Sequence, residues 1–352
     1  MSLTRLLYLS FFTLSIVAGS SMLAIGQDKK VKTPKDSTKT KKTRVKSDTT
    51  RSRISQDTSF VKAKIDTLSV GESKSGYSDL EIGGGVNTVN ADLVNDDVKK
   101  DAWTNIQVDE TVFDSYYDFK RFLKKKHNIA LGMDYMFLYQ FASFSFTEKQ
   151  AASGIFRFFG TWRVPFKNEA TTGTLTFKIE NRHKIGTAEL PRNLGYSAGG
   201  ALSTASFKDF QWGLTNLYWK QHLLNGRVSY VVGIIDPGDW LDLYPLLNPF
   251  KFYLNEAFFN SPAMALPNQG LGFAFAFKKI VPHIYLAGGL QDANGEPTKW
   301  VGKNFESFFN NNEYLFWIEL GYSADPDLPL IDGQTIHLMY WHQDARVADR
   351  EA

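Results

Sequence analysis

Alternation of apolar and polar residues, repeated in about nine separate stretches, constrains the fold of this chain more than any other feature. Between Thr174 and Arg182, for example, Leu175, Phe177 and Ile179 alternate with polar or charged residues. Successive side chains of a strand point to opposite faces of a sheet, so each stretch has one apolar and one polar face. Such strands, joined by polar loops, are typical of a transmembrane β-barrel. We therefore predict an all-β fold, an up-and-down antiparallel β-barrel.

The alternating stretches and the turn residues between them predict where the strands lie. Asn225 and Gly226 supply the positive-φ residues of a tight hairpin between the fourth and fifth strands. The connections 184–210, 237–268 and 292–311 are long, so we expect them to be extracellular or folded into the lumen. We predict that 237–268 folds inward as a constriction; a surface loop is the alternative. The nine strands are expected near 128–140, 152–165, 172–183, 211–222, 227–236, 269–278, 281–291, 312–323 and 333–343.

The cost of placing charge in lipid decides which face of each strand is the outside. In the stretch 152–165, Arg157 and Arg163 share one face, and Phe156, Phe158 and Trp162 share the other. An arginine turned to lipid costs about 2–4 kcal/mol near the midplane of the bilayer. We therefore assign the arginine face to the lumen. The same reasoning assigns to the lumen the charged residues Asp134, Lys178, Glu180, Arg182 and Glu319.

Aromatic residues make up 14% of the chain, which a barrel explains by lipid-facing phenylalanine and by Tyr and Trp at the two membrane interfaces. In the stretch 269–278, Phe273, Phe275 and Phe277 are predicted to contact lipid, whereas Ala274 and Ala276 are predicted to line water. An aromatic-rich β-sandwich is the alternative fold.

The N-terminal part of the chain divides into segments of different composition. Residues 1–26 are predicted to be a signal peptide, with Arg5, an apolar core and a small-residue cleavage site at 24–26. The segment 27–75 is basic and polar, so we expect a disordered linker. The segment 76–126 is expected to be periplasmic, with an amphipathic helix over 112–126, and 127–352 to be the partial barrel. The chain has no cysteine, which excludes disulfides and thiolate metal sites.

Acidic and aromatic residues are concentrated at the start of the connection 237–268. Asp236, Asp239 and Asp242 have the oxygen ligands that Ca²⁺ prefers, but the spacing lacks the glycine and terminal glutamate of an EF-hand. We interpret Asp236, Trp240 and Asp242 as solute-contacting residues instead. The sequence has no nucleophile elbow, P-loop or dinucleotide fingerprint. It therefore predicts no enzyme activity, no cofactor, no metal and no nucleic-acid partner.

Five segments in the stretch 217–294 carry a resemblance to a known family. They are Leu-Tyr-Trp-Lys-Gln at 217–221, Tyr-Val-Val-Gly-Ile-Ile-Asp at 230–236, Asp-Trp-Leu-Asp at 239–242, Leu-Asn-Glu-Ala-Phe-Phe-Asn-Ser-Pro at 254–262 and Pro-Asn-Gln-Gly-Leu-Gly at 267–272. In this order they resemble the carbohydrate-selective porin (OprB-type) family. The resemblance implies a sixteen-stranded barrel that passes sugars passively through a constriction of charged and aromatic side chains. With about nine strands and a polar end at 345–352, we expect the chain to lack several C-terminal strands; a miscount or a homo-oligomer is the alternative.

Two hypotheses about function follow. The first is an outer-membrane porin of a Gram-negative bacterium for weakly selective diffusion of sugars and other small polar solutes. Its partners would be these solutes, outer-membrane lipid and the barrel assembly machinery. The second is a secreted or surface β-rich protein that binds or hydrolyses polysaccharide. Heat-modifiable migration on a gel favours the first hypothesis, and solubility without detergent favours the second.

Overall fold

The computed structural model describes residues 12–17, 88–97, 114–166, 171–199, 206–243, 263–298, 300–323 and 335–346, and positions 248, 250, 254 and 255. The predicted cleavage site at 24–26 and the predicted basic linker 27–75 lie outside the described residues. The first described segment, β1 (Phe12–Val17), falls within the predicted signal peptide and pairs with the last strand of the sheet. The signal peptide itself stays a prediction.

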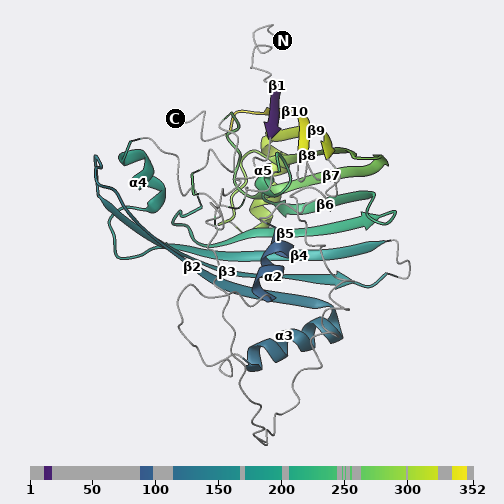
Figure 1. The fold of residues 1–352 in the computed structure, drawn as a ribbon, viewed down its shortest axis with the longest axis horizontal. Helices are drawn as coiled ribbons and strands as arrows, with labels where there is room; N and C mark the ends of the chain where they lie inside the picture. Colours follow the sequence, from purple (N-terminus) through teal and green to yellow (C-terminus); the bar gives the residue numbers. More distant parts are fainter. Residues whose placement is uncertain are drawn as a thin grey trace, which may run out of the picture. The chain divides into compact units, whose positions relative to one another are not determined.

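The strands form one antiparallel sheet of ten strands, in the order β1-β10-β9-β8-β7-β6-β5-β4-β3-β2 (Figure 1). From β2 to β10 each strand pairs with the next along the chain, which confirms the all-β, antiparallel prediction. The nine predicted strands all form, with boundaries within a few residues of those expected. They are β2 (Ile129–Phe141), β3 (Gln150–Val164), β4 (Thr172–Lys184), β5 (Gln211–Leu223), β6 (Val228–Ile235), β7 (Gly270–Val281), β8 (Ile284–Asp292), β9 (Tyr314–Ser323) and β10 (Thr335–Gln343).

The three longest connections all lie at one end of the sheet, and the two tightest turns lie at the other. The turn between β5 and β6 is tight, and Asn225 and Gly226 both have positive φ there, as the sequence predicted. The turn between β7 and β8 contains only residues 282 and 283. Because antiparallel strands alternate in direction, the long connections β4–β5, β6–β7 and β8–β9 all fall at the other end. This separation of long and short loops is the arrangement of an up-and-down barrel.

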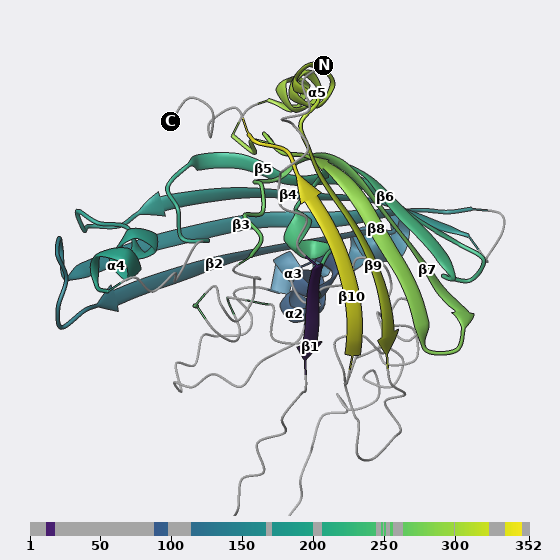
Figure 2. The ribbon, with the colours of Figure 1, turned by 90° about the horizontal axis from the view of Figure 1, so that it is seen from above.

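The sheet is curved (Figure 2). Its convex face carries exposed large apolar side chains on every strand from β2 to β10 except β4, where Leu175, Phe177 and Ile179 are half-buried. Exposure reaches 58% at Phe137 and 53% at Leu320, both in the interior of their strands. The register aligns these residues into rows across the sheet, as in the pair Tyr135–Phe156. The large apolar residues exposed on this face are Met133, Tyr135, Phe137, Tyr139, Phe141, Trp162, Trp212, Val232, Phe273, Ile284, Phe316, Ile318, Leu320, Tyr322, Ile336 and Leu338.

The concave face is covered, and this corrects one expectation. Ala274 and Ala276 are 2% and 3% exposed, inside an apolar cluster that also contains Val231, Trp240 and Met264. The prediction that these alanines line water is wrong. Alternation identifies the face on which a residue lies, but here the connection after β6 packs over that face and excludes solvent from it.

Short helices accompany the sheet. The predicted helix over 112–126 is confirmed as α3, and one residue, Asn128, separates it from β2. The buried residue of α3 is Lys120, a charged residue, and not one of its apolar residues. A second helix, α2, lies on the concave side of the sheet and contacts β2, β3 and β4 (Figures 1 and 2). Within the described part of the chain, no helix has the length and apolar character needed to cross a membrane. The helices are α2 (Val89–Asp97), α3 (Asp114–His127), α4 (Pro191–Ser197), the 3₁₀ turn η3 (Pro237–Asp239) and α5 (Val301–Asn311).

Candidate functional site

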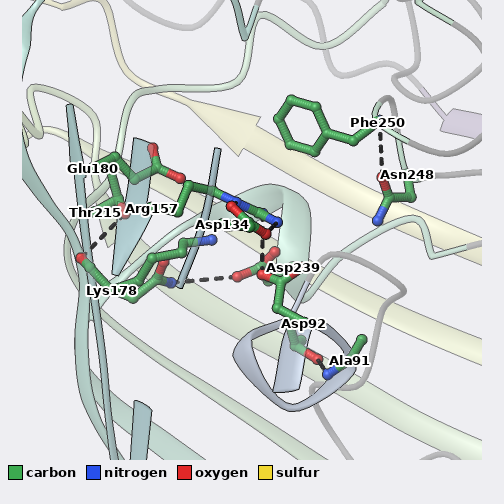
Figure 3. A network of polar contacts seen from close by, with 12 residues as sticks. Ala91, Asp92, Asp134, Arg157, Lys178, Glu180, Thr215, Asp239, Asn248 and Phe250 are labelled. Carbon is green, nitrogen blue, oxygen red and sulfur yellow. Dashed lines mark hydrogen bonds and ion pairs between the residues drawn. The ribbon is translucent and has the colours of Figure 1, made fainter. Parts of the chain in front are cut away.

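A row of charged side chains crosses the concave face at the centre of β2, β3 and β4. The register pairs Asp134 with Arg157 and Arg157 with Glu180, so the three side chains lie side by side on one face. Lys178 and Arg182 lie on the same face of β4, two residues before and after Glu180. The period of two that predicted these strands thus also brings five of the predicted lumen residues together. Figure 3 shows four of them, Asp134, Arg157, Lys178 and Glu180.

Arg157 is the centre of this network. Its Nε and Nη2 donate to the two carboxylate oxygens of Asp134 at 2.8 and 2.5 Å, and its Nη1 donates to Asp92 Oδ2 at 3.1 Å. The side chains of Arg157 and Asp92 are 7% and 3% exposed. A planar guanidinium can bind one carboxylate with two parallel bonds and still offer a donor to another. Arg157 therefore connects the sheet to α2.

Glu180 and Arg182 form a second buried ion pair on β4. Arg182 Nε donates to Glu180 Oε2 at 2.9 Å, and its Nη1 donates to the carbonyl oxygen of Ser206 at 2.9 Å. The guanidinium also lies over the ring of Phe210, 4.8 Å from its centroid. Arg182 thus attaches the end of the long β4–β5 connection to the concave face.

The docking of α2 depends on few contacts. Thr88 precedes the helix, and its Oγ1 accepts a long hydrogen bond of 3.5 Å from the backbone N–H of Ala91. Val89 and Leu93 pack against Phe159 of β3 in a small apolar cluster. Burial raises the pKa of the Asp92 carboxyl, and the neighbouring charge of Arg157 opposes that rise. The sequence did not predict α2 or the role of Asp92.

The described ends of the connection after β6, 237–243 and 263–268, pack against the concave face. The constriction predicted for the whole stretch 237–268 stays a prediction, because most of its middle lies outside the described residues. Asp236 Oδ1 accepts a hydrogen bond of 3.0 Å from the backbone N–H of Gly238 and so begins η3. Asp239 accepts from Asn216 Nδ2 at 3.3 Å. Burial raises the pKa of the Asp239 carboxyl well above its usual range, with the charge of Lys178 opposing it.

A second polar cluster fixes this connection to the last strands. The backbone N–H of Asp242 donates to Glu319 Oε2 at 3.3 Å, and the Asp242 carboxylate lies 3.1 Å from His337 Nε2. The hydroxyl of Tyr285 donates to Glu319 Oε1 at 2.5 Å. Trp240 packs edge-to-face on Tyr218, with the ring centroids 5.3 Å apart. Side chains of β5, β8, β9 and β10 therefore hold the loop.

The predicted site residues thus separate into two groups. Asp134, Arg157, Lys178, Glu180 and Arg182 form the network on β2 to β4, whereas Asp242 and Glu319 belong to the cluster on β8 to β10. Arg163 lies outside both groups and is half-buried.

The three acidic residues whose oxygen ligands suit Ca²⁺ have different partners. Asp236 binds the start of η3 and the Gln269 side chain, Asp239 binds Asn216, and Asp242 binds the second cluster. Among the residues that the structure describes, no group of three or more His or acidic side chains could hold a metal ion.

A hollow of about 1130 Å³ lies at the long-loop end of the sheet. The β4–β5, β6–β7 and β8–β9 connections contribute to its walls, through Asn193, Phe210, Asn268, Glu296 and Trp300 among others. Cross-links between these connections shape it, as where Lys208 Nζ donates to Asn268 Oδ1 at 2.9 Å. The end of the sheet with the long loops is thus open, polar and partly aromatic.

Comparison with known proteins gives one distant likeness. No protein-family model matches the chain, and no curated protein matches it. The solved structure described as "High pH structure of Pseudomonas putida OprB" is similar, with a TM-score of 0.46 and 16% sequence identity. The similarity covers 66% of this chain and 56% of that chain, so this chain spans little more than half of that protein's length. That protein has the name of the family that the sequence resembles, and membership of the family stays a prediction.

Proposed function

We propose that this chain forms part of the wall and of the lumen of an outer-membrane porin, through which small polar solutes diffuse passively. The observation that carries this proposal is the convex face, where large apolar and aromatic side chains are exposed on eight of the nine strands from β2 to β10 and are half-buried on β4. The largest apolar patch of a soluble monomer usually covers about 300–600 Å². A lipid environment removes the cost of a larger apolar surface, because hydrocarbon contacts it as favourably as a protein core does.

The concave face supports the proposal that the solutes are small, polar and uncharged. Its buried charges are paired, between strands for Arg157 with Asp134 and within β4 for Arg182 with Glu180. A wall of balanced charge attracts neither cations nor anions strongly, and its hydrogen-bonding groups suit sugars and other neutral polar solutes. In this proposal the long loops face the outside of the cell, and α3 faces the periplasm together with the short turns. Spanning a bilayer requires every strand edge to be paired, so additional strands complete the wall beside the edges of this sheet.

Conductance of the purified full-length protein in planar bilayers tests this proposal. We expect discrete, weakly selective conductance steps without voltage gating, and sugar-permeable vesicles after reconstitution. Heat-modifiable migration on a gel should accompany them. Silent bilayers at high protein load, with a folded β signal in circular dichroism, would contradict the proposal. Solubility without detergent would favour the secreted polysaccharide-binding alternative.

A further inference from the structure

The helix α2 lies where the proposed channel has its lumen. It contacts β2, β3 and β4 on the concave side of the sheet, beside the central row of charges (Figures 2 and 3). Asp92 binds Arg157 in that row, and Asp96 binds Lys120 of α3 by an ion pair. Gly132 of β2 leaves the space for this arrangement, because a Cβ there would lie 2.5 Å from the Phe159 ring and 3.2 Å from Asp96 Oδ2.

The sheet does not depend on α2 for its hydrogen bonds. The β2–β3 and β3–β4 ladders are continuous through the row that the helix contacts. By contrast, α2 depends on the sheet, because an isolated helix of nine residues is unstable in water. Only Val89 and Leu93 contribute buried apolar side chains from the helix. The described contacts of Val89, Asp92 and Leu93 with the sheet are made by side chains and are not part of the strand ladders, so we expect the ladders to persist when α2 is removed.

The carboxylate of Asp92 also belongs to the charge balance of the wall. The cations of the row are Arg157, Lys178 and Arg182, and the carboxylates on the strands are Asp134 and Glu180. Asp239 comes from the connection after β6, and Asp92 comes from α2. When Asp92 leaves, Arg157 keeps Asp134 but loses its other ion-pair partner, so the wall becomes more positive.

From these contacts we propose that α2 is a lumenal insert that narrows the channel and sets its charge selectivity, with Asp92 as the selectivity-determining residue. The inference rests on the proposed porin function. Neutralising Asp92 should make the channel more selective for anions, and removing the helix should also make it wider.

Single-channel recordings under a KCl gradient test this inference. Asp92→Asn keeps the shape of the side chain, and we expect its reversal potential to shift toward anion selectivity. Deletion of 88–97 should shift it in the same direction and raise the conductance severalfold. Asp118→Asn, which neutralises an exposed carboxylate of α3, is the matched control and should leave both values unchanged. Unchanged selectivity and conductance in both variants of α2, with a conducting wild type, would overturn the inference and leave the porin function standing.

Cysteine labelling tests the docking of α2 without relying on conduction. The chain has no cysteine, so single substitutions at two adjacent residues of the helix can be compared directly. Leu93 is 7% exposed and Val94 is 46% exposed. Leu93→Cys should react slowly with a small water-soluble thiol reagent, and Val94→Cys should react fast. Equal, fast labelling of both in the folded protein would show that α2 is not docked, even if the bilayers were silent and the porin proposal had failed.

Discussion

Ile318→Arg should lower the free energy of unfolding of the lipid-embedded protein by about 2–4 kcal/mol, the cost of an arginine near the midplane of a bilayer. Ile318 lies at the middle of β9, on the convex face, and is 37% exposed. Urea titration of the protein folded in lipid vesicles, followed by tryptophan fluorescence, measures the change. If this face contacted water, the same substitution at a partly exposed site would be within about 0.5 kcal/mol of neutral.

Ile284→Arg is the matched control for this prediction. Ile284 is the first residue of β8, at the end of the sheet, and is 40% exposed. An arginine near the membrane interface costs only about 0–1 kcal/mol. The two isoleucines therefore differ mainly in their depth along the sheet. Equal effects of the two substitutions would contradict a membrane-spanning orientation of the strands.

Arg157→Met should destabilise the protein by about 3–5 kcal/mol, the usual cost of removing one partner from a buried ion pair. The substitution keeps an unbranched apolar side chain but leaves the carboxylates of Asp92 and Asp134 without their shared cation. It should also release α2, so that a cysteine at Leu93 becomes reactive. The same urea titration and thiol labelling measure the two effects.

Two controls separate charge from packing in this experiment. Arg163→Met lies on the same strand and the same face but outside the network, and we expect an effect within about 0.5 kcal/mol. Adding Asp92→Asn and Asp134→Asn to Arg157→Met removes the uncompensated charges, so it should recover part of the lost stability. A triple variant as unstable as Arg157→Met alone would show that packing, and not charge, sets the cost.

The strands could be predicted from the sequence because their pattern is local. In β4, Leu175, Phe177 and Ile179 alternate with polar residues. This alternation predicts both that the segment is a strand and which of its faces is apolar. The same period groups Lys178, Glu180 and Arg182. The register between neighbouring strands decides which of these charges form pairs. The predicted hairpins define that register only to within a few residues.

The inward fold of the connection 237–268 was predicted, but the contacts by which it and α2 cover the concave face could not be, because they join distant segments. In α2 only Val89 and Leu93 are apolar and buried, so no helical stripe marks the segment, and the helix depends on Phe159 of β3. Asp242 and His337 meet although 95 residues separate them. Ala274 shows the consequence: alternation identified its face correctly but could not show that a loop covers it.

The central claim, that the convex face contacts lipid, is tested most directly by quenching from brominated lipid tails. Phe137 and Leu138 are adjacent on β2 and point to opposite faces, with Phe137 58% exposed on the convex side. A fluorophore attached to a single cysteine at each position would be compared in vesicles with and without brominated tails. We predict strong quenching at position 137 and little at position 138. Quenching at neither position would contradict a membrane-spanning sheet, and quenching at position 138 alone would show that the faces are reversed.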